Sequence, residues 1–233
     1  MATPRGHGGS SVVGVAPGSR IGPVSVGAAS VAAMTTVLIA HSALGLRPAI
    51  LDLADRVRAL GFRVVAPDLF GGAVFEGGPE GYAAAMAHLD TARPSAEAAL
   101  REAYAACSAP VVVIGFSMGA MAVQRLAEHE PGVVGALLVA GGGRYGAEFG
   151  DDGRWRGGIP LALHRMIDDE WVDAEPAARL VAEAARAGSD VSDYVYPGRA
   201  HLFMDAGLPD EHDSGATELF HARVQGFLSR FSA

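Results

Sequence analysis

The sequence has few of the features typical of secreted, membrane or nucleic-acid-binding proteins. Its one cysteine, Cys107, excludes an intramolecular disulfide and fits a reducing cytoplasm. No apolar run approaches the roughly 20 residues that a membrane-spanning helix needs. Charged residues make up only 19% of the chain, and the formal net charge of −8 argues against a nucleic-acid or anionic-membrane partner. We therefore expect a cytoplasmic protein with no nucleic-acid and no membrane partner.

Hydrophobic residues are abundant, at 50% of the 233 residues, which is enough for one large folded domain. Residues 1–33 differ from the rest, because they are rich in Gly, Ser, Ala, Pro and Val and contain no acidic residue. Glycines and prolines interrupt every apolar run in this segment, so it fits a secretory signal poorly. We predict a flexible N-terminal extension over 1–33 and a single α/β domain over 34–233.

From Thr35 onward, strand-like and helix-like patterns alternate. The predicted strands are Thr36–Ala40, Phe62–Ala66, Val111–Ile114, Val133–Ala140, Pro160–Met166 and Val191–Tyr196. The predicted helices are Pro48–Leu60, Tyr82–Leu89, Ser95 to about Cys107, Ser117–Glu130, one following Pro176, and Ala216–Phe231. This alternation predicts a mostly parallel sheet with helices on both faces, and such sheets bind ligands at the carboxyl ends of their strands.

The most informative stretch is the run Gly115-Phe116-Ser117-Met118-Gly119, which directly follows the apolar strand Val111–Ile114. It has the form G-x-S-x-G between a buried strand and a helix, which is the pattern of a nucleophile elbow. The turn is so tight that side chains two residues before and after the serine would collide, so both positions favour glycine. A glycine-flanked serine that merely caps a helix is the alternative.

A serine nucleophile needs a base and a group that orients the base, and both are available at later strand ends. Asp168 and Asp169 follow one predicted strand, and His201 follows the last one. The chain order Ser, Asp, His is that of α/β-hydrolases rather than of chymotrypsin or subtilisin. The pattern alone leaves open which aspartate is the acid and which caps the next helix.

Several stretches of the chain from about Thr35 to the C-terminus resemble the dienelactone hydrolase family of α/β-hydrolases. The matching stretches are Leu44–Arg47, Gly61–Leu69, the elbow, Asp169–Val172 and Tyr196–Phe203. The resemblance implies that Asp169 is the acid, because the family's acid precedes two bulky residues and a valine, and that His201 is the base. It also implies that the backbone amides of Ala43 and Met118 form the oxyanion hole.

Three positions depart from the dienelactone hydrolases proper. Those enzymes carry a cysteine nucleophile where this chain has Ser117, and a restraining glutamate in the first loop where it has Ser42. The two changes are consistent with each other, because a serine–histidine pair needs no such restraint. The arginines that hold the substrate carboxylate are also not found, and Asp205 falls near one of their positions. Dienelactone itself is therefore not the expected substrate.

We expect a serine hydrolase that cleaves a small carboxylic ester or lactone through an acyl-enzyme, with no metal or organic cofactor. Acyl transfer by the same three residues and a non-catalytic binding protein are the alternatives, and nothing in the sequence indicates an oligomeric state. The Gly141–Gly158 segment could border the pocket. The segment contains Arg144, Tyr145, Arg154, Trp155 and Arg156. Its three arginines could bind an acidic substrate, although a solvated loop is the favoured interpretation.

Overall fold

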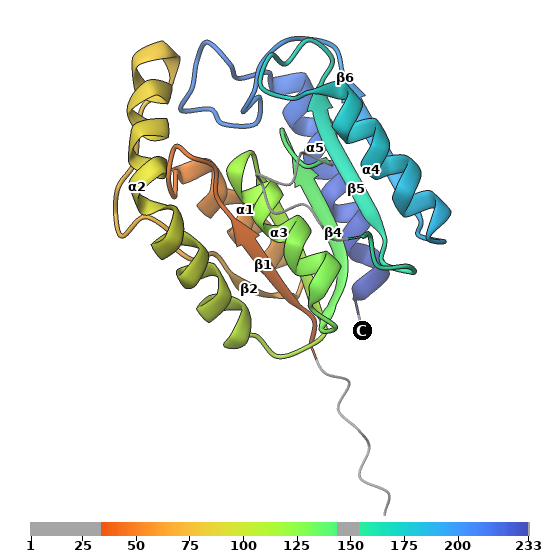
Figure 1. The fold of residues 1–233 in the computed structure, drawn as a ribbon. Helices are drawn as coiled ribbons and strands as arrows, with labels where there is room; N and C mark the ends of the chain where they lie inside the picture. The colour runs from red at the N-terminus through yellow and green to blue at the C-terminus, as the bar shows by residue number, and fades with distance from the viewer. Residues whose placement is uncertain (1–33, 144–153, 233) are drawn as a thin grey trace, which may run out of the picture. The chain divides into compact units, whose positions relative to one another are not determined.

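A six-stranded parallel sheet forms the centre of the computed structural model, which describes residues 34–143 and 154–232 (Figure 1). Its strands run in the order β2-β1-β3-β4-β5-β6, and every neighbouring pair is parallel. They are β1 (Thr36–Ala40), β2 (Arg63–Val65), β3 (Val111–Phe116), β4 (Val133–Val139), β5 (Leu161–Met166) and β6 (Val191–Tyr196). The predicted α/β architecture is confirmed, while the predicted extension over 1–33 lies outside the described residues.

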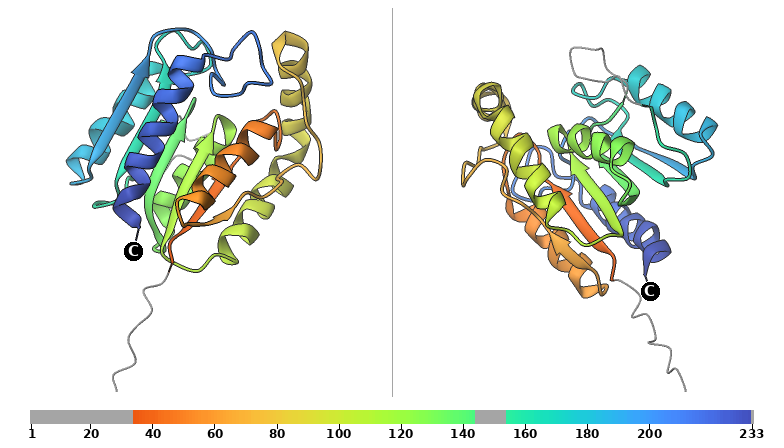
Figure 2. Two further views of the ribbon diagram at one scale, coloured as in Figure 1. Left: turned by 180° about the vertical axis from the view of Figure 1, so that it is seen from behind. Right: turned by 60° about the horizontal axis from the view of Figure 1, so that its bottom comes forward.

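Helices cover both faces of this sheet. α1 and α5 lie on one face, and α2, α3 and α4 lie on the other (Figure 2). Their bounds are α1 (Pro48–Ala59), α2 (Gly78–Ala105), α3 (Met118–His129), α4 (Ala174–Arg186) and α5 (Ser214–Leu228), with a 3-10 turn at Ser229–Phe231. Every residue of β1 and β3 is buried, because these central strands are covered on both sides. Of the helices in the described ranges, none combines the length and hydrophobicity that a bilayer crossing requires.

The prediction of two helices, Tyr82–Leu89 and one from Ser95, is wrong, because α2 runs without a break from Gly78 to Ala105. Pro94 lies inside it and removes one backbone hydrogen bond. The helix continues because Leu89, Ala96 and Leu100 are buried along one stripe that spans the proline, while Pro94 itself is exposed. Burial of this stripe outweighs the local penalty.

Two other predicted helices begin earlier than expected, because aspartates cap them. Asp173 accepts a hydrogen bond from the amide of Glu175 at 3.0 Å, so α4 begins at Ala174, before Pro176. Asp213 accepts one from the amide of Ala216 at 2.8 Å, so α5 begins at Ser214. Strand β2 is shorter than predicted, and β1 and β6 have the predicted bounds.

Candidate active site

The elbow between β3 and α3 places Ser117 in a backbone conformation that only a tight turn imposes. Its φ of 51° and ψ of −115° lie in a region that residues with a side chain rarely adopt. A Cβ on Gly115 would lie 2.4 Å from the carbonyl oxygen of Gly119. A Cβ on Gly119 would lie 2.5 Å from the carbonyl oxygens of Ala40 and His41. Glycine is thus needed at both positions, for the steric reason predicted from the motif.

The three side chains predicted as nucleophile, base and acid form one chain of hydrogen bonds. The Oγ of Ser117 lies 2.8 Å from Nε2 of His201, and Nδ1 of His201 lies 2.8 Å from Oδ2 of Asp169. Asp169 and His201 are each 5% exposed. The residues come from loops at the carboxyl ends of β3, β5 and β6, which the parallel sheet brings to one edge.

The two adjacent aspartates after β5 have different surroundings. The other carboxylate oxygen of Asp169, Oδ1, accepts a hydrogen bond from the amide of Trp171 at 2.9 Å, which fixes the carboxylate toward His201. The side chain of Asp168 is exposed, and its amide donates to the carbonyl of Gly198. Of the two aspartates, Asp169 is the one that contacts His201, which is the contact that the family resemblance implies for the acid.

Ala43 and Met118, whose amides are the predicted oxyanion donors, line the same cavity as Ser117 and His201. Met118 is the first residue of α3, so its N–H precedes the first hydrogen bond within the helix. The N–H of Ala43 donates to none of the residues that the structure describes. Two backbone donors beside a serine hydroxyl are the arrangement that an oxyanion requires.

A buried histidine shapes the loop that contains Ala43. His41 Nε2 accepts a hydrogen bond from the amide of Leu69 at 2.9 Å, so the ring is protonated at Nδ1, which donates to the carbonyl of Ser42 at 2.7 Å. Burial lowers the pKa of His41 and keeps the ring neutral. The hydroxyl of Ser42 accepts from the amide of Leu44 at 3.2 Å, so this serine also stabilises the loop.

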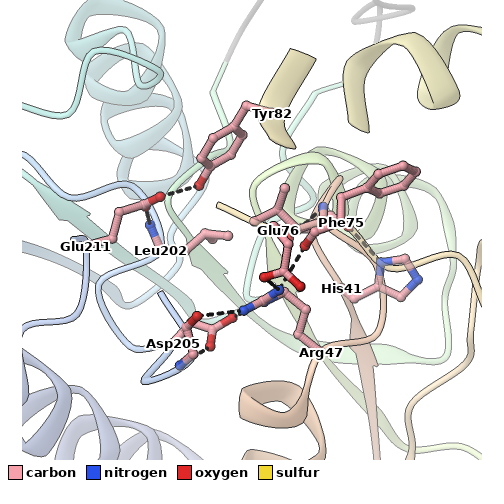
Figure 3. Close-up of polar contacts among 11 residues, drawn as sticks. His41, Arg47, Phe75, Glu76, Tyr82, Leu202, Asp205 and Glu211 are labelled. Atoms are coloured by element: carbon pink, nitrogen blue, oxygen red, sulfur yellow. Dashed lines mark hydrogen bonds and ion pairs between the residues drawn. The ribbon is translucent and has the colours of Figure 1, made fainter. Parts of the chain in front are cut away.

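The same loop is tied to the His201 loop by a buried ion pair. Nε of Arg47 lies 2.5 Å from Oδ2 of Asp205, and its other guanidinium nitrogens donate to the carbonyls of Phe75 and Gly207 (Figure 3). Asp205 is the residue that falls near one of the family's substrate-binding arginine positions in the sequence. In the structure its carboxylate faces Arg47, and it does not line the cavity at Ser117.

A second link holds the backbone next to His201. Glu211 accepts a hydrogen bond from the hydroxyl of Tyr82 with Oε1 and one from the amide of Leu202 with Oε2, both at 2.8 Å (Figure 3). The ring of Tyr82 stacks on Trp171 with centroids 5.2 Å apart. Trp171 in turn lies 5.8 Å from the ring of His201. Aromatic rings thus form one wall beside the predicted base.

A cavity of about 670 Å³ opens at Ser117 and continues between α2 and α3. The described part of the Gly141–Gly158 segment lies elsewhere, apart from Gly141 itself. Trp155 is buried and donates from Nε1 to the carbonyl of Ile159 and the hydroxyl of Ser189, and Arg156 donates to the carbonyl of Val133. None of Arg154, Trp155 and Arg156 lines the cavity. Arg154 is exposed, as the interpretation of a solvated loop predicts, whereas Trp155 is buried and Arg156 is half-buried. Arg144 and Tyr145 lie outside the described residues.

Within the described ranges, no group of three or more His, Cys, Asp or Glu side chains could hold a metal ion. Sequence reasoning missed three features of the site: His41, the Arg47–Asp205 pair and the Tyr82–Glu211 link. Arg47 and Asp205 are 158 residues apart in the sequence, and Tyr82 and Glu211 are 129 apart, so no local pattern indicates that they interact. For His41 a signal existed, because it directly follows the first strand.

Comparisons with known proteins agree with this architecture. The dienelactone hydrolase-like promiscuous phosphotriesterase P91, from metagenomic libraries, is 22% identical with a TM-score of 0.64, over 85% of this chain and 87% of that chain. Esterase PE8 is 17% identical with a TM-score of 0.55, over 83% and 93%. A structure from work on the metagenome-derived lipolytic enzymes LipS and LipT is 15% identical with a TM-score of 0.56, over 84% and 94%. These likenesses show the α/β-hydrolase fold, as predicted.

A search of the curated proteins finds no match. The family model of the dienelactone hydrolase family matches residues 24–232, which is most of the chain. The resemblance inferred from the sequence motifs is therefore confirmed. The chain belongs to the dienelactone hydrolase family of α/β-hydrolases.

Proposed function

We propose that the protein is a serine hydrolase that cleaves a carboxylic ester or lactone through an acyl-enzyme, with Ser117 as nucleophile, His201 as base and Asp169 as acid. The observation that carries the proposal is the continuous hydrogen-bond chain from Ser117 Oγ through both ring nitrogens of His201 to the buried carboxylate of Asp169. A binding protein has no need of that arrangement next to two free backbone donors.

In the first half-reaction, Ser117 Oγ attacks the carbonyl carbon while His201 Nε2 accepts the hydroxyl proton. Asp169 holds the proton on Nδ1 and stabilises the imidazolium. The oxyanion of the tetrahedral intermediate accepts hydrogen bonds from the amides of Ala43 and Met118, each worth about 3 kcal/mol of transition-state stabilisation. His201 then gives its proton to the leaving oxygen, and the acyl group stays on Ser117.

In the second half-reaction, His201 accepts a proton from water, the hydroxide oxygen attacks the acyl carbon, and Ser117 leaves with the proton returned. Water is the only co-reactant, so the proposal includes no metal and no organic cofactor. If an amine, alcohol or thiol takes the place of water, the same residues perform acyl transfer. Measuring product partition with an added acceptor distinguishes the two.

The test combines labelling by a fluorophosphonate probe with turnover of p-nitrophenyl esters. We expect Ser117→Ala to lose labelling completely, and Asp169→Asn to lower kcat by about 10⁴ because it favours the wrong His201 tautomer. Ser229→Ala is the matched control, since Ser229 is exposed and, among the described residues, its hydroxyl bonds only to the carbonyl of Gly226. Labelling or turnover that persists unchanged in Ser117→Ala would refute the proposal.

A further inference from the structure

The cavity at Ser117 has an extended apolar arm between two helices. From α2 and α3 it is lined by Leu89, Ala96, Leu100, Met121, Ala122 and Leu126. Between Met118 at the elbow and Leu126, α3 rises about 12 Å, at about 1.5 Å per residue. Leu89, Ala96 and Leu126 are between 4% and 7% exposed, so the walls are parts of the core rather than loose surface side chains. We call this arm the α2–α3 groove.

Beyond Ala122, the residues of α3 and its C-cap that line the α2–α3 groove are mostly polar or charged, namely Arg125, His129 and Glu130 beside Leu126. Glu97 on α2 lies 3.8 Å from Arg101 and 3.9 Å from Arg125 on α3. These ion pairs begin where the apolar lining of α3 ends. Apart from Arg93 on α2, the α2 and α3 residues that line the groove before this cluster are apolar, so an uncharged chain is accommodated up to the cluster, and a longer one would have to displace hydrated charges.

A second hollow adjoins the cavity, because Met86 and Trp171 line both. Its volume is about 460 Å³, and its lining includes Tyr82, Met86 and Trp171. The rings of Tyr82 and Trp171 lie 6.2 and 5.8 Å from the His201 ring. In ester cleavage the base gives its proton to the leaving oxygen, so the alcohol part lies on the side of the base. The acyl part then extends away from His201, along α3.

Resting on the proposed function, these features lead us to infer that the substrates are esters of medium-length, unbranched aliphatic acids whose acyl chain lies in the α2–α3 groove. An extended alkyl chain of about eight to ten carbon atoms, with C–C bonds of about 1.5 Å, spans the apolar length. Each methylene that enters the groove raises kcat/KM about three- to fourfold, until the chain reaches the ion pairs. The chain length of the acid is thus set by the distance from Ser117 to Glu97 and Arg125.

The experiment measures kcat/KM for p-nitrophenyl esters of 2, 4, 8, 10 and 16 carbons, so that only the acyl group varies. We expect the C8 ester to exceed the C2 ester about a thousandfold, because six methylenes at three- to fourfold each are added, and the C10 ester to be at least as good. The C16 ester should fall below both. Ala122 lies one turn from Met118 and is only partly buried, so Ala122→Phe fills the groove about 6 Å from the elbow. It should reduce the C10-to-C2 ratio at least tenfold, and Ala122→Leu should reduce it less.

Ala87→Phe is the matched control, because Ala87 is exposed on α2 and lines neither hollow. It should keep the wild-type chain-length profile. A wild-type profile that is flat or falls from C2 upward, or an Ala122→Phe profile equal to that of wild type, would overturn the inference. Circular dichroism checks that each variant is folded.

Failure of the proposed function gives a different result, namely no turnover of any ester and no Ser117-dependent labelling. In that case calorimetry with decanoate tests the groove independently of catalysis. Binding by wild type that Ala122→Phe weakens at least tenfold supports the groove, and absence of binding overturns it.

Discussion

Removing either member of the Arg47–Asp205 pair should destabilise the fold severely. The two side chains are 7% and 5% exposed, and they join the loop after β1 to the loop after β6 (Figure 3). Breaking a buried ion pair from one side leaves an uncompensated charge, which costs about 3–5 kcal/mol. Arg47→Met should lie at the upper end of this range, because it also leaves the carbonyls of Phe75 and Gly207 without their donor.

Asp205→Asn should lie at the lower end, since an amide oxygen can still accept from Arg47 and the two carbonyls keep their partners. The double variant leaves no buried charge at these two positions, so its loss should be smaller than the sum of the single losses by at least about 2 kcal/mol. Urea unfolding gives each free energy and completes the cycle. Glu76→Gln is the control, because Glu76 is 89% exposed at 3.9 Å from Arg47 and should change stability by less than about 0.5 kcal/mol. Strictly additive single losses would refute this reasoning.

Two further predictions concern pH and steric fit. Burial lowers the pKa of His164 from 6.5 to about 3, so the unfolded chain takes up the proton first and stability falls as the pH drops below 6.5. Between pH 8 and pH 5 this histidine should remove about 2 kcal/mol from the free energy of unfolding. Urea titrations at each pH should show that His164→Gln weakens the dependence of the free energy of unfolding on pH. An unchanged dependence would contradict this prediction. Gly119→Ala should cost about 1–3 kcal/mol and most of the proposed esterase activity, because its Cβ meets the carbonyls of Ala40 and His41. Gly226→Ala, with open space around the new methyl group in α5, should instead gain about 1 kcal/mol and keep the activity, and equal melting temperatures for both variants would refute the steric argument.

The parts of the fold that the sequence predicted well share a local cause. β1 and β6 have the expected bounds, because runs of β-branched and aromatic residues end there at loop-forming residues. The residues proposed for catalysis could be found because parallel strands bring their carboxyl ends together, so Ser117, Asp169 and His201 needed only to follow strands in the right order. This inference needs only the order of the strands along the chain, and it needs no knowledge of which side chains are in contact.

The parts that could not be predicted depend on contacts between distant segments. Pro94 predicts a helix end from its chemistry, and only the packing of the stripe on either side of it keeps α2 continuous. Arg47 and Asp205 become partners only once β1 and β6 share a sheet. The α2–α3 groove likewise has no sequence signature. Its walls are apolar residues of α2 and α3, and in the sequence these residues look like ordinary core residues.

The backbone conformation of Ser117 lowers the stability of the fold in order to position the side-chain hydroxyl. Its φ of 51° and ψ of −115° cost about 1–3 kcal/mol, which a glycine at the same position would largely escape. Against a typical net stability of about 5–15 kcal/mol, that is a sizeable fraction given up at one residue. A glycine at position 117 would therefore stabilise the fold and remove the hydroxyl, so the proposed nucleophile is held in place at a cost in stability.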